Sequence, residues 1–313
     1  MNPTDKLTRK MLRGIWHALL TPWTDQFELD EKRYIAEVRS YESTGIHGMY
    51  TGGTTGEFYA QDDDTFQRIT AITCEHAHDI GLPVQIGCTA TATRIVCKRI
   101  AHARKHNANA IQLGLPYWLE LNDNELNDFF AAICNAAGDT PIVYYQTMRN
   151  KRRIKNEHLQ SLAAKHPTFI GMKDTDGELA QLESLCKGSP GLAVFGGEPD
   201  LVTRMKLGGT GAYASITGLN APLIVRMYEL AAAGNFQEAE KIQTSLKHML
   251  DDALIPLIHE GYLDSALDRL MRTSGGGDVG LQCQPPYQPC TQTHVEQLTA
   301  WCEEHEPMLL KTE

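Results

Sequence analysis

The chain has 313 residues, of which 42% are hydrophobic and 22% charged, and this ordinary globular composition excludes disordered and fibrous proteins. Its 39 acidic residues outnumber its 29 basic residues, giving a net charge of −10. This balance argues against a nucleic acid or an anionic membrane as the main partner, because both require a basic surface. No apolar run approaches the roughly 20 residues of a membrane span, and the polar N-terminus lacks a signal-peptide pattern. We therefore expect a cytoplasmic globular protein.

Eight short apolar runs, bounded mostly by Gly, Pro, Asn or Asp, are predicted to be strands. In chain order they cover residues 15–20, 48–51, 83–87, 110–113, 142–145, 169–173, 193–195 and 211–214. An amphipathic stretch typical of a helix follows each of them, at residues 30–43, 64–79, 92–106, 123–137, 156–165, 179–186, 200–206 and 223–233. Eight strand–helix units predict an α/β fold of the (β/α)8 or TIM-barrel class. An open doubly wound sheet usually has five or six strands, and no GxGxxG pattern follows the first run.

The barrel is predicted to span residues 14–233 and to carry the active site. Residues 234–313 form a helical C-terminal segment, with predicted helices at 235–259, 262–272 and 293–305. The first of these is expected to end or kink near Pro256, because proline cannot donate the helical hydrogen bond. No linker separates the two parts, so we expect this segment to pack on the barrel.

A Gly- and Thr-rich loop, TGGTTGE at residues 51–57, follows the second predicted strand. Its glycines allow backbone N–H groups to converge on an anion, and its threonine hydroxyls supply further donors. A tight turn with capping threonines is the structural alternative.

Two later strands end in reactive side chains. Tyr144, near the end of the fifth strand, is a candidate proton carrier, or else a large residue that caps the core. Lys173 closes the apolar sixth strand, and lysine is rarely buried without a purpose or a partner. Burial is expected to lower the pKa of its amine, making it nucleophilic toward a carbonyl. The alternative is a lysine that extends to solvent where the strand ends.

Active sites of (β/α)8 barrels lie at the C-terminal ends of the strands, so the loop, Tyr144 and Lys173 are expected on one rim. Together they supply the parts of a Schiff-base reaction on a 2-oxo acid, and no cofactor is implied. His102 and His106 have the i, i+4 spacing of metal ligands, but no acidic third ligand is placed nearby. We therefore expect no metal.

The sequence resembles the dihydrodipicolinate synthase and N-acetylneuraminate lyase family of class I aldolases. The resemblance covers most of the chain and is strongest at the motif GTTGE, residues 53–57, and at Gly171-Met172-Lys173. Further similar segments are Gly14-Ile15, Leu20-Thr21-Pro22, Pro116-Tyr117-Trp118, Tyr144, Leu207-Gly208-Gly209-Thr210-Gly211 and, more weakly, Pro285-Pro286.

The resemblance implies that Lys173 attacks the C2 carbonyl of pyruvate or another 2-oxo acid. It implies that Tyr144 is the general acid/base and that the Thr55 hydroxyl holds it. The pyruvyl carboxylate would be bound by Thr54 together with the backbone N–H of Thr55. Gly53, the preceding residue, would belong to the same binding loop. An aldehyde or sugar acid is the implied partner substrate.

The resemblance also implies a homotetramer, with Trp118 at or near a subunit contact. Arg149, five residues after Tyr144, occupies the place where synthases of this family bind the carboxylate of the second substrate. The chain departs from the family by lacking a Pro after the tyrosine, by carrying Trp118 in place of a tyrosine, and by having Tyr213 in place of an aliphatic residue. A tryptophan at this place is similar to hydratase-aldolases of the family that take aromatic substrates.

The sequence thus predicts a lyase, either an aldolase or a dehydratase, that acts on a 2-oxo acid through a lysine Schiff base. A dihydrodipicolinate synthase that condenses pyruvate with aspartate semialdehyde is the first alternative. A non-catalytic relative that binds a 2-oxo acid is the second.

Overall fold

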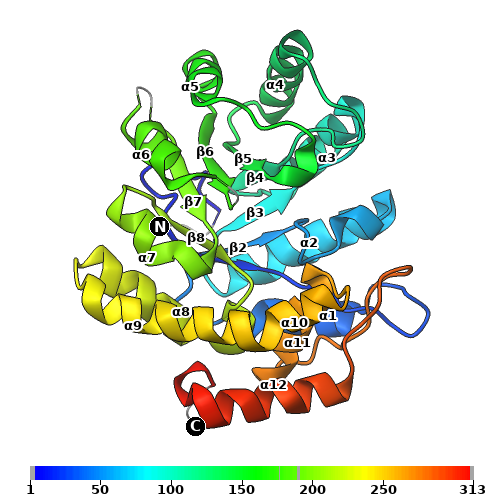
Figure 1. Ribbon diagram of the computed structural model, residues 1–313. Helices are drawn as coiled ribbons and strands as arrows, with labels where there is room; N and C mark the ends of the chain where they lie inside the picture. The colour runs from blue at the N-terminus through cyan, green and yellow to red at the C-terminus, as the bar shows by residue number, and fades with distance from the viewer. Residues whose placement is uncertain (1–3, 176, 189–190, 311–313) are drawn as a thin grey trace.

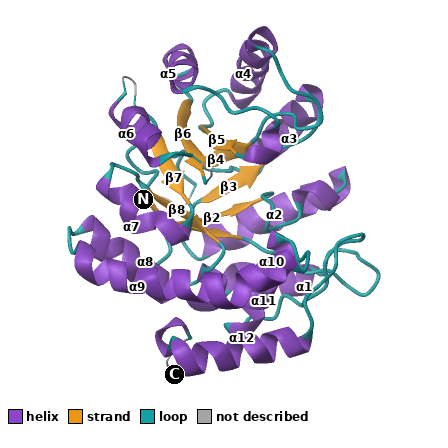
Figure 2. Cartoon of the chain, viewed as in Figure 1, coloured by secondary structure: helices purple, strands orange, loops and turns teal. Residues whose placement is uncertain are grey.

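The computed structural model describes residues 4–175, 177–188 and 191–310. Eight parallel strands, hydrogen-bonded in sequence order, close into a barrel at the centre of the molecule (Figure 2). They are β1 (Gly14–Ala18), β2 (Gly48–Thr51), β3 (Val84–Gly87), β4 (Ala110–Leu113), β5 (Ile142–Gln146), β6 (Phe169–Asp174), β7 (Ala193–Gly196) and β8 (Gly211–Ala214). The predicted (β/α)8 barrel is confirmed, and every predicted strand ends within two residues of the observed one.

Helices surround the barrel and connect its strands. They are α1 (Glu31–Arg39), α2 (Asp63–Asp79), α3 (Thr93–Lys105), α4 (Asp123–Ala137), α5 (Asn156–Lys165), α6 (Leu179–Lys187), α7 (Leu201–Lys206) and α8 (Thr217–Ala232). Helix α4 shows why the local sequence folds this way. Asn122 and Glu125 form a capping box at its start, and Phe130 and Ile133 lie on the buried face. Single 3₁₀ turns follow three strands, at η1 (Phe58–Ala60), η2 (Met148–Asn150) and η3 (Glu198–Asp200).

Side chains alternate along each strand between the barrel interior and the layer beneath the helices. Trp16, Tyr50 and Val143 belong to the cluster that fills the interior. Their neighbours Ile15 and Met49 belong to the outer core. This alternation decides which side chain of each strand reaches the rim of the interior.

The C-terminal segment lies along one side of the barrel, with α12 at its outer edge (Figure 1). It contains α9 (Phe236–Met249), the π-helical turn η4 (Leu250–Leu254), α10 (Ile255–His259), α11 (Asp264–Ser274), α12 (Gln292–His305) and the 3₁₀ turn η5 (Pro307–Leu309). The π-turn ends shortly before Pro256, where the proline ring disfavours regular α-helical bonding. Helix α11 packs against α8. Within the described ranges, no helix is both long and apolar enough to cross a membrane.

Candidate active site

Lys173 projects from β6 into the barrel interior, where three tyrosine rings surround its ammonium group. Its Nζ lies 4.4 Å from the ring centroid of Tyr145, 5.3 Å from that of Tyr50 and 5.6 Å from that of Tyr213. The same nitrogen donates a hydrogen bond of 3.2 Å to the Tyr50 hydroxyl. Only 7% of Lys173 is exposed. Aromatic faces attract a cation, so these rings stabilise the protonated amine.

The pKa of Lys173 reflects this cage. Burial lowers the pKa, but Tyr145, Tyr50 and the Glu198 carboxylate raise it, and the net pKa lies above the ordinary lysine value. The expectation of a lowered pKa was therefore wrong, because it considered burial without these neighbours. Lys173 must release a proton before it can act as a nucleophile.

Tyr144, predicted to lie on the rim with Lys173 and to be held by the Thr55 hydroxyl, does neither among the described residues. It is fully buried in the outer core, where its ring lies 5.8 Å from Phe130 and its hydroxyl accepts a 3.4 Å hydrogen bond from Asn150 Nδ2. Tyr145 instead pairs in register with Lys173 and lines the same cavity. Because successive strand residues point to opposite faces, only one of the two tyrosines can line this cavity, and it is Tyr145.

The Gly/Thr loop reaches the same cavity, as predicted. Both Thr54 and Thr55 line it beside Lys173. Position 53 requires glycine, because a Cβ there would clash with the ring of Tyr50 at 2.6 Å. The structure therefore brings the loop and the lysine together on one rim.

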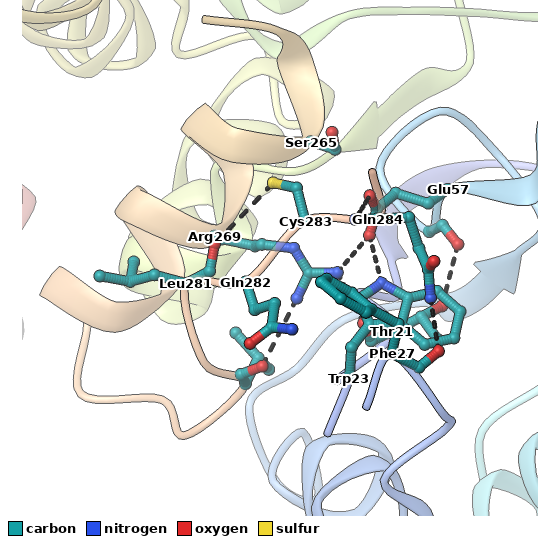
Figure 3. A network of polar contacts seen from close by, with 12 residues as sticks. Thr21, Trp23, Phe27, Glu57, Ser265, Arg269, Leu281, Gln282, Cys283 and Gln284 are labelled. Atoms are coloured by element: carbon teal, nitrogen blue, oxygen red, sulfur yellow. Dashed lines mark hydrogen bonds and ion pairs between the residues drawn. The ribbon is translucent and has the colours of Figure 1, made fainter. Parts of the chain in front are cut away.

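A buried ion pair joins this loop to the C-terminal helices (Figure 3). The Glu57 carboxylate pairs with the Arg269 guanidinium of α11, and both side chains are fully buried. Glu57 also accepts hydrogen bonds from the Trp23 indole and from the Gln284 backbone N–H, the latter at 2.9 Å. Arg269 donates a second bond, of 2.6 Å, to the Thr21 carbonyl. A buried pair held by several hydrogen bonds is rigid, so it fixes α11 against the loop.

The acidic side of the cavity was missed by the sequence analysis. Asp268 and Glu198 line it together with Ser215. Glu198 comes two residues after β7, so the rule that strand ends carry active sites could have found it. Asp268 belongs to α11, outside the eight strand–helix units, and no sequence pattern pointed to it.

Of the three other predicted binding residues, one lines the cavity, one lies at its mouth and one lies outside it. Tyr213 lines the cavity and donates a 2.6 Å hydrogen bond to Gln85 Oε1. Arg149 lies at the mouth, more than half exposed, and forms a 2.9 Å ion pair with Asp264. Trp118 is 76% exposed on the loop after β4, and it is absent from the residues that line the cavities described here.

Two cavities lie side by side at this rim. The first has a volume of about 460 Å³, is largely polar and surrounds Lys173. The second, of about 230 Å³, is lined by the aromatic rings of Phe58, Tyr59, Tyr117 and Tyr287. Four residues border both cavities: Thr54, Tyr145, Arg149 and Asp264. A molecule bound at Lys173 could therefore extend past Tyr145 toward an aromatic compartment.

The structure gives no support for a metal centre among the residues that it describes. No group of three or more His, Cys, Asp or Glu side chains is arranged there to hold an ion. His102 on α3 and His106, the residue that follows this helix, contact each other with ring centroids 4.7 Å apart.

Comparisons with known proteins agree with this architecture. An N-acetylneuraminate lyase of Escherichia coli strain SMS-3-5 is 26% identical over 295 residues, which cover 92% of this chain and 95% of the lyase. The E. coli K12 prophage protein YagE, of the dihydrodipicolinic acid synthase family, was solved in complex with pyruvate. It superposes with a TM-score of 0.84 at 22% identity, covering 94% of this chain and 98% of YagE.

A further solved relative is an N-acetylneuraminate lyase from Fusobacterium nucleatum, with a TM-score of 0.84 and 21% identity, covering 96% of this chain and all of the lyase chain. At these identities the solved structures establish a shared fold. The model of the dihydrodipicolinate synthetase family matches residues 11–305, nearly the whole chain. The chain therefore belongs to the dihydrodipicolinate synthetase family.

Proposed function

We propose that this protein is a lyase that acts on pyruvate or another 2-oxo acid through a Schiff base on Lys173. The observation that carries the proposal is a buried amine that shares one cavity with the Gly/Thr loop and contacts Tyr145. Family membership points to lyase chemistry, and a structural relative was solved with pyruvate. A non-catalytic relative would bind the 2-oxo acid without forming an imine, and the borohydride experiment below distinguishes it from the lyase.

In the proposed reaction, the deprotonated Lys173 Nζ attacks C2 of the 2-oxo acid, whose carboxylate is held by Thr54 and Thr55. The carbonyl oxygen departs as water, and a protonated C=N bond replaces C=O. This imine accepts the electron pair of the bond between C3 and C4 when that bond breaks, leaving an enamine and an aldehyde. Tyr145 takes the proton from the C4 hydroxyl as the bond breaks and delivers it to the enamine carbon, which gives the imine of the shortened 2-oxo acid. Water then hydrolyses this imine, releasing the product and regenerating Lys173, and the reverse sequence forms the bond.

The partner substrate is proposed to be an aldehyde whose remaining portion is uncharged and apolar or aromatic. The aromatic second cavity adjoins Lys173, with Tyr145 on their border. The alternative of a dihydrodipicolinate synthase requires a cation to bind the carboxylate of aspartate semialdehyde. Arg149 is the candidate, but Asp264 already neutralises it at 2.9 Å. This pairing favours the lyase with an uncharged partner.

Borohydride reduction in the presence of pyruvate is expected to attach a reduced pyruvyl group to Lys173. Reduction converts the reversible imine to a stable amine, so peptide mass mapping can locate it. Parallel samples with other 2-oxo acids will identify the preferred donor. A label on a different lysine, or no label with any 2-oxo acid, would contradict the mechanism.

We further propose a homotetramer with Trp118 at or near a subunit contact. Trp118, Leu119 and Met148 are each more than 70% exposed and lie on the loops after the neighbouring strands β4 and β5. Exposed apolar groups of this size commonly mark interaction surfaces. Light scattering at micromolar concentration should give the mass of four chains, and Trp118→Glu should reduce it. A monomeric wild-type protein would refute this assembly.

A further inference from the structure

Asp268 is a buried carboxyl group that borders the Lys173 cavity and has no part in the reaction proposed above. Only 6% of this α11 residue is exposed. Thr55 and Ser215 line the same cavity, and their hydroxyl groups are the neighbours that favour the ionised form of its carboxyl group. In the described part of the chain, no Lys, Arg or His side chain forms an ion pair with it. A buried carboxyl without a cation is costly to ionise.

The charged groups nearest Asp268 add to this cost. Burial is the largest influence and, with the Asp264 and Glu198 carboxylates, raises the pKa of Asp268 to about 7, although its two hydroxyl partners lower it. Lys173 on β6 and Arg149 on η2 are cations of the same cavity, and Arg149 is paired with Asp264. The remaining titratable or charged groups that line the cavity are Tyr50, Tyr145, Tyr213, Asp200 and Arg204. Asp268 therefore changes its protonation state near neutral pH.

The protonation state of Asp268 determines where the single hydroxyl hydrogen of Thr55 is donated. A threonine or serine hydroxyl donates only one hydrogen. Ser215 is positioned to donate its hydrogen to Glu198 Oε1 at 3.4 Å, an oxygen that also accepts from the Ile216 N–H at 3.1 Å. Ionised Asp268 accepts bonds only, so it draws the Thr55 hydrogen to itself. Neutral Asp268 can instead donate to the Thr55 oxygen, which leaves the Thr55 hydrogen free for a ligand.

We propose that Asp268 is a positioning residue that must be in its neutral acid form for Thr55 to bind the carboxylate of the 2-oxo acid. This inference rests on the proposed function and assigns the Thr55 hydroxyl to that carboxylate, since the Tyr144 hydroxyl bonds to Asn150 and not to Thr55. When Asp268 is ionised, Thr55 turns toward it and a further negative charge faces the incoming anion. Its sequence neighbour Arg269 is fixed by Glu57 in the buried pair (Figure 3). This pair holds α11 against the loop, and Asp268 lines the same cavity as Thr55.

The test is the pH dependence of pyruvate binding to the full-length protein and to its Asp268→Asn variant, an uncharged isostere that keeps a donor. The pyruvate concentration for half-maximal borohydride labelling is measured from pH 6 to pH 8. Titration of Lys173 is common to both proteins, so the wild-type value is divided by the variant value at each pH. This ratio is expected to rise about tenfold between pH 6 and pH 8, because only the neutral acid binds. Asp278→Asn, which removes an exposed carboxylate from the same segment, should follow the wild type.

Calorimetry gives a second measurement that does not depend on the folding of a variant. Pyruvate binding by the wild-type protein at pH 7, compared in buffers of different ionisation enthalpy, should take up about half a proton per site. A constant ratio across the pH range, or binding without proton uptake, would overturn the role of Asp268 while labelled Lys173 still supported the lyase. Absence of pyruvate binding and labelling in both proteins would instead overturn the proposed function together with this inference.

Discussion

Replacing Lys173 by arginine is expected to remove imine formation while keeping a positive charge among the three tyrosine rings. A guanidinium remains protonated and is no nucleophile, so the variant retains the electrostatics of the cage but loses the reaction. Loss of a covalent nucleophile costs about 10³–10⁶ in rate. The proposed enamine exchanges the methyl protons of pyruvate for deuterium, which NMR follows in D2O without a second substrate. We expect this exchange to fall to the level of buffer.

Lys187→Arg is the matched control for that measurement. Lys187 is exposed at the end of α6, where it pairs with Glu183, and it lies outside the cavity. Its variant should exchange pyruvate protons at the wild-type rate. Exchange by Lys173→Arg at more than about a tenth of the wild-type rate would rule out the imine, given the losses typical of nucleophile removal.

Replacing Tyr145 by phenylalanine is expected to slow the same exchange by about 10²–10⁴, the usual cost of losing a positioned proton carrier. The ring and its contact with Lys173 at 4.4 Å remain, so borohydride labelling should persist. The loss therefore separates proton transfer from imine formation.

Tyr144→Phe provides the control at the adjacent position. Its hydroxyl bonds only to Asn150 among the hydrogen bonds of the described structure, so the variant should lose about 1 kcal/mol of stability and exchange at the wild-type rate. Slow exchange in Tyr144→Phe with normal exchange in Tyr145→Phe would reverse the assignment. Normal exchange in both would transfer the role to Tyr50, the hydrogen-bonded neighbour of Lys173.

The sequence alone determined the barrel, because eight apolar runs separated by amphipathic stretches admit few other arrangements. It also indicated Lys173 as a candidate nucleophile. A lysine at the end of a buried strand is unusual, because burial removes the water that solvates its charge. The Gly/Thr loop was recognisable because the close packing around Gly53 excludes a Cβ, and because consecutive threonines at the end of a strand are typical of a binding loop.

The choice between Tyr144 and Tyr145 depended on the tertiary structure. A displacement of one residue turns every side chain of a strand to the other face, and the pairing of β5 with β6 is irregular at Ile142 and Val143. Because Tyr144 and Tyr145 are identical residue types, the local sequence does not show which of them faces the barrel interior.

Asp268 and the pKa of Lys173 were also decided by tertiary contacts. Asp268 reaches Thr55 across more than 200 residues of sequence, because the Glu57–Arg269 pair fixes α11 on the rim of the barrel. The pKa of the Lys173 amine is raised, despite burial, because tyrosines from β2 and β5 and the Glu198 carboxylate lie around it. Electrostatic effects depend on distances between groups in space, and those distances are set only when the strands close and the last helices pack.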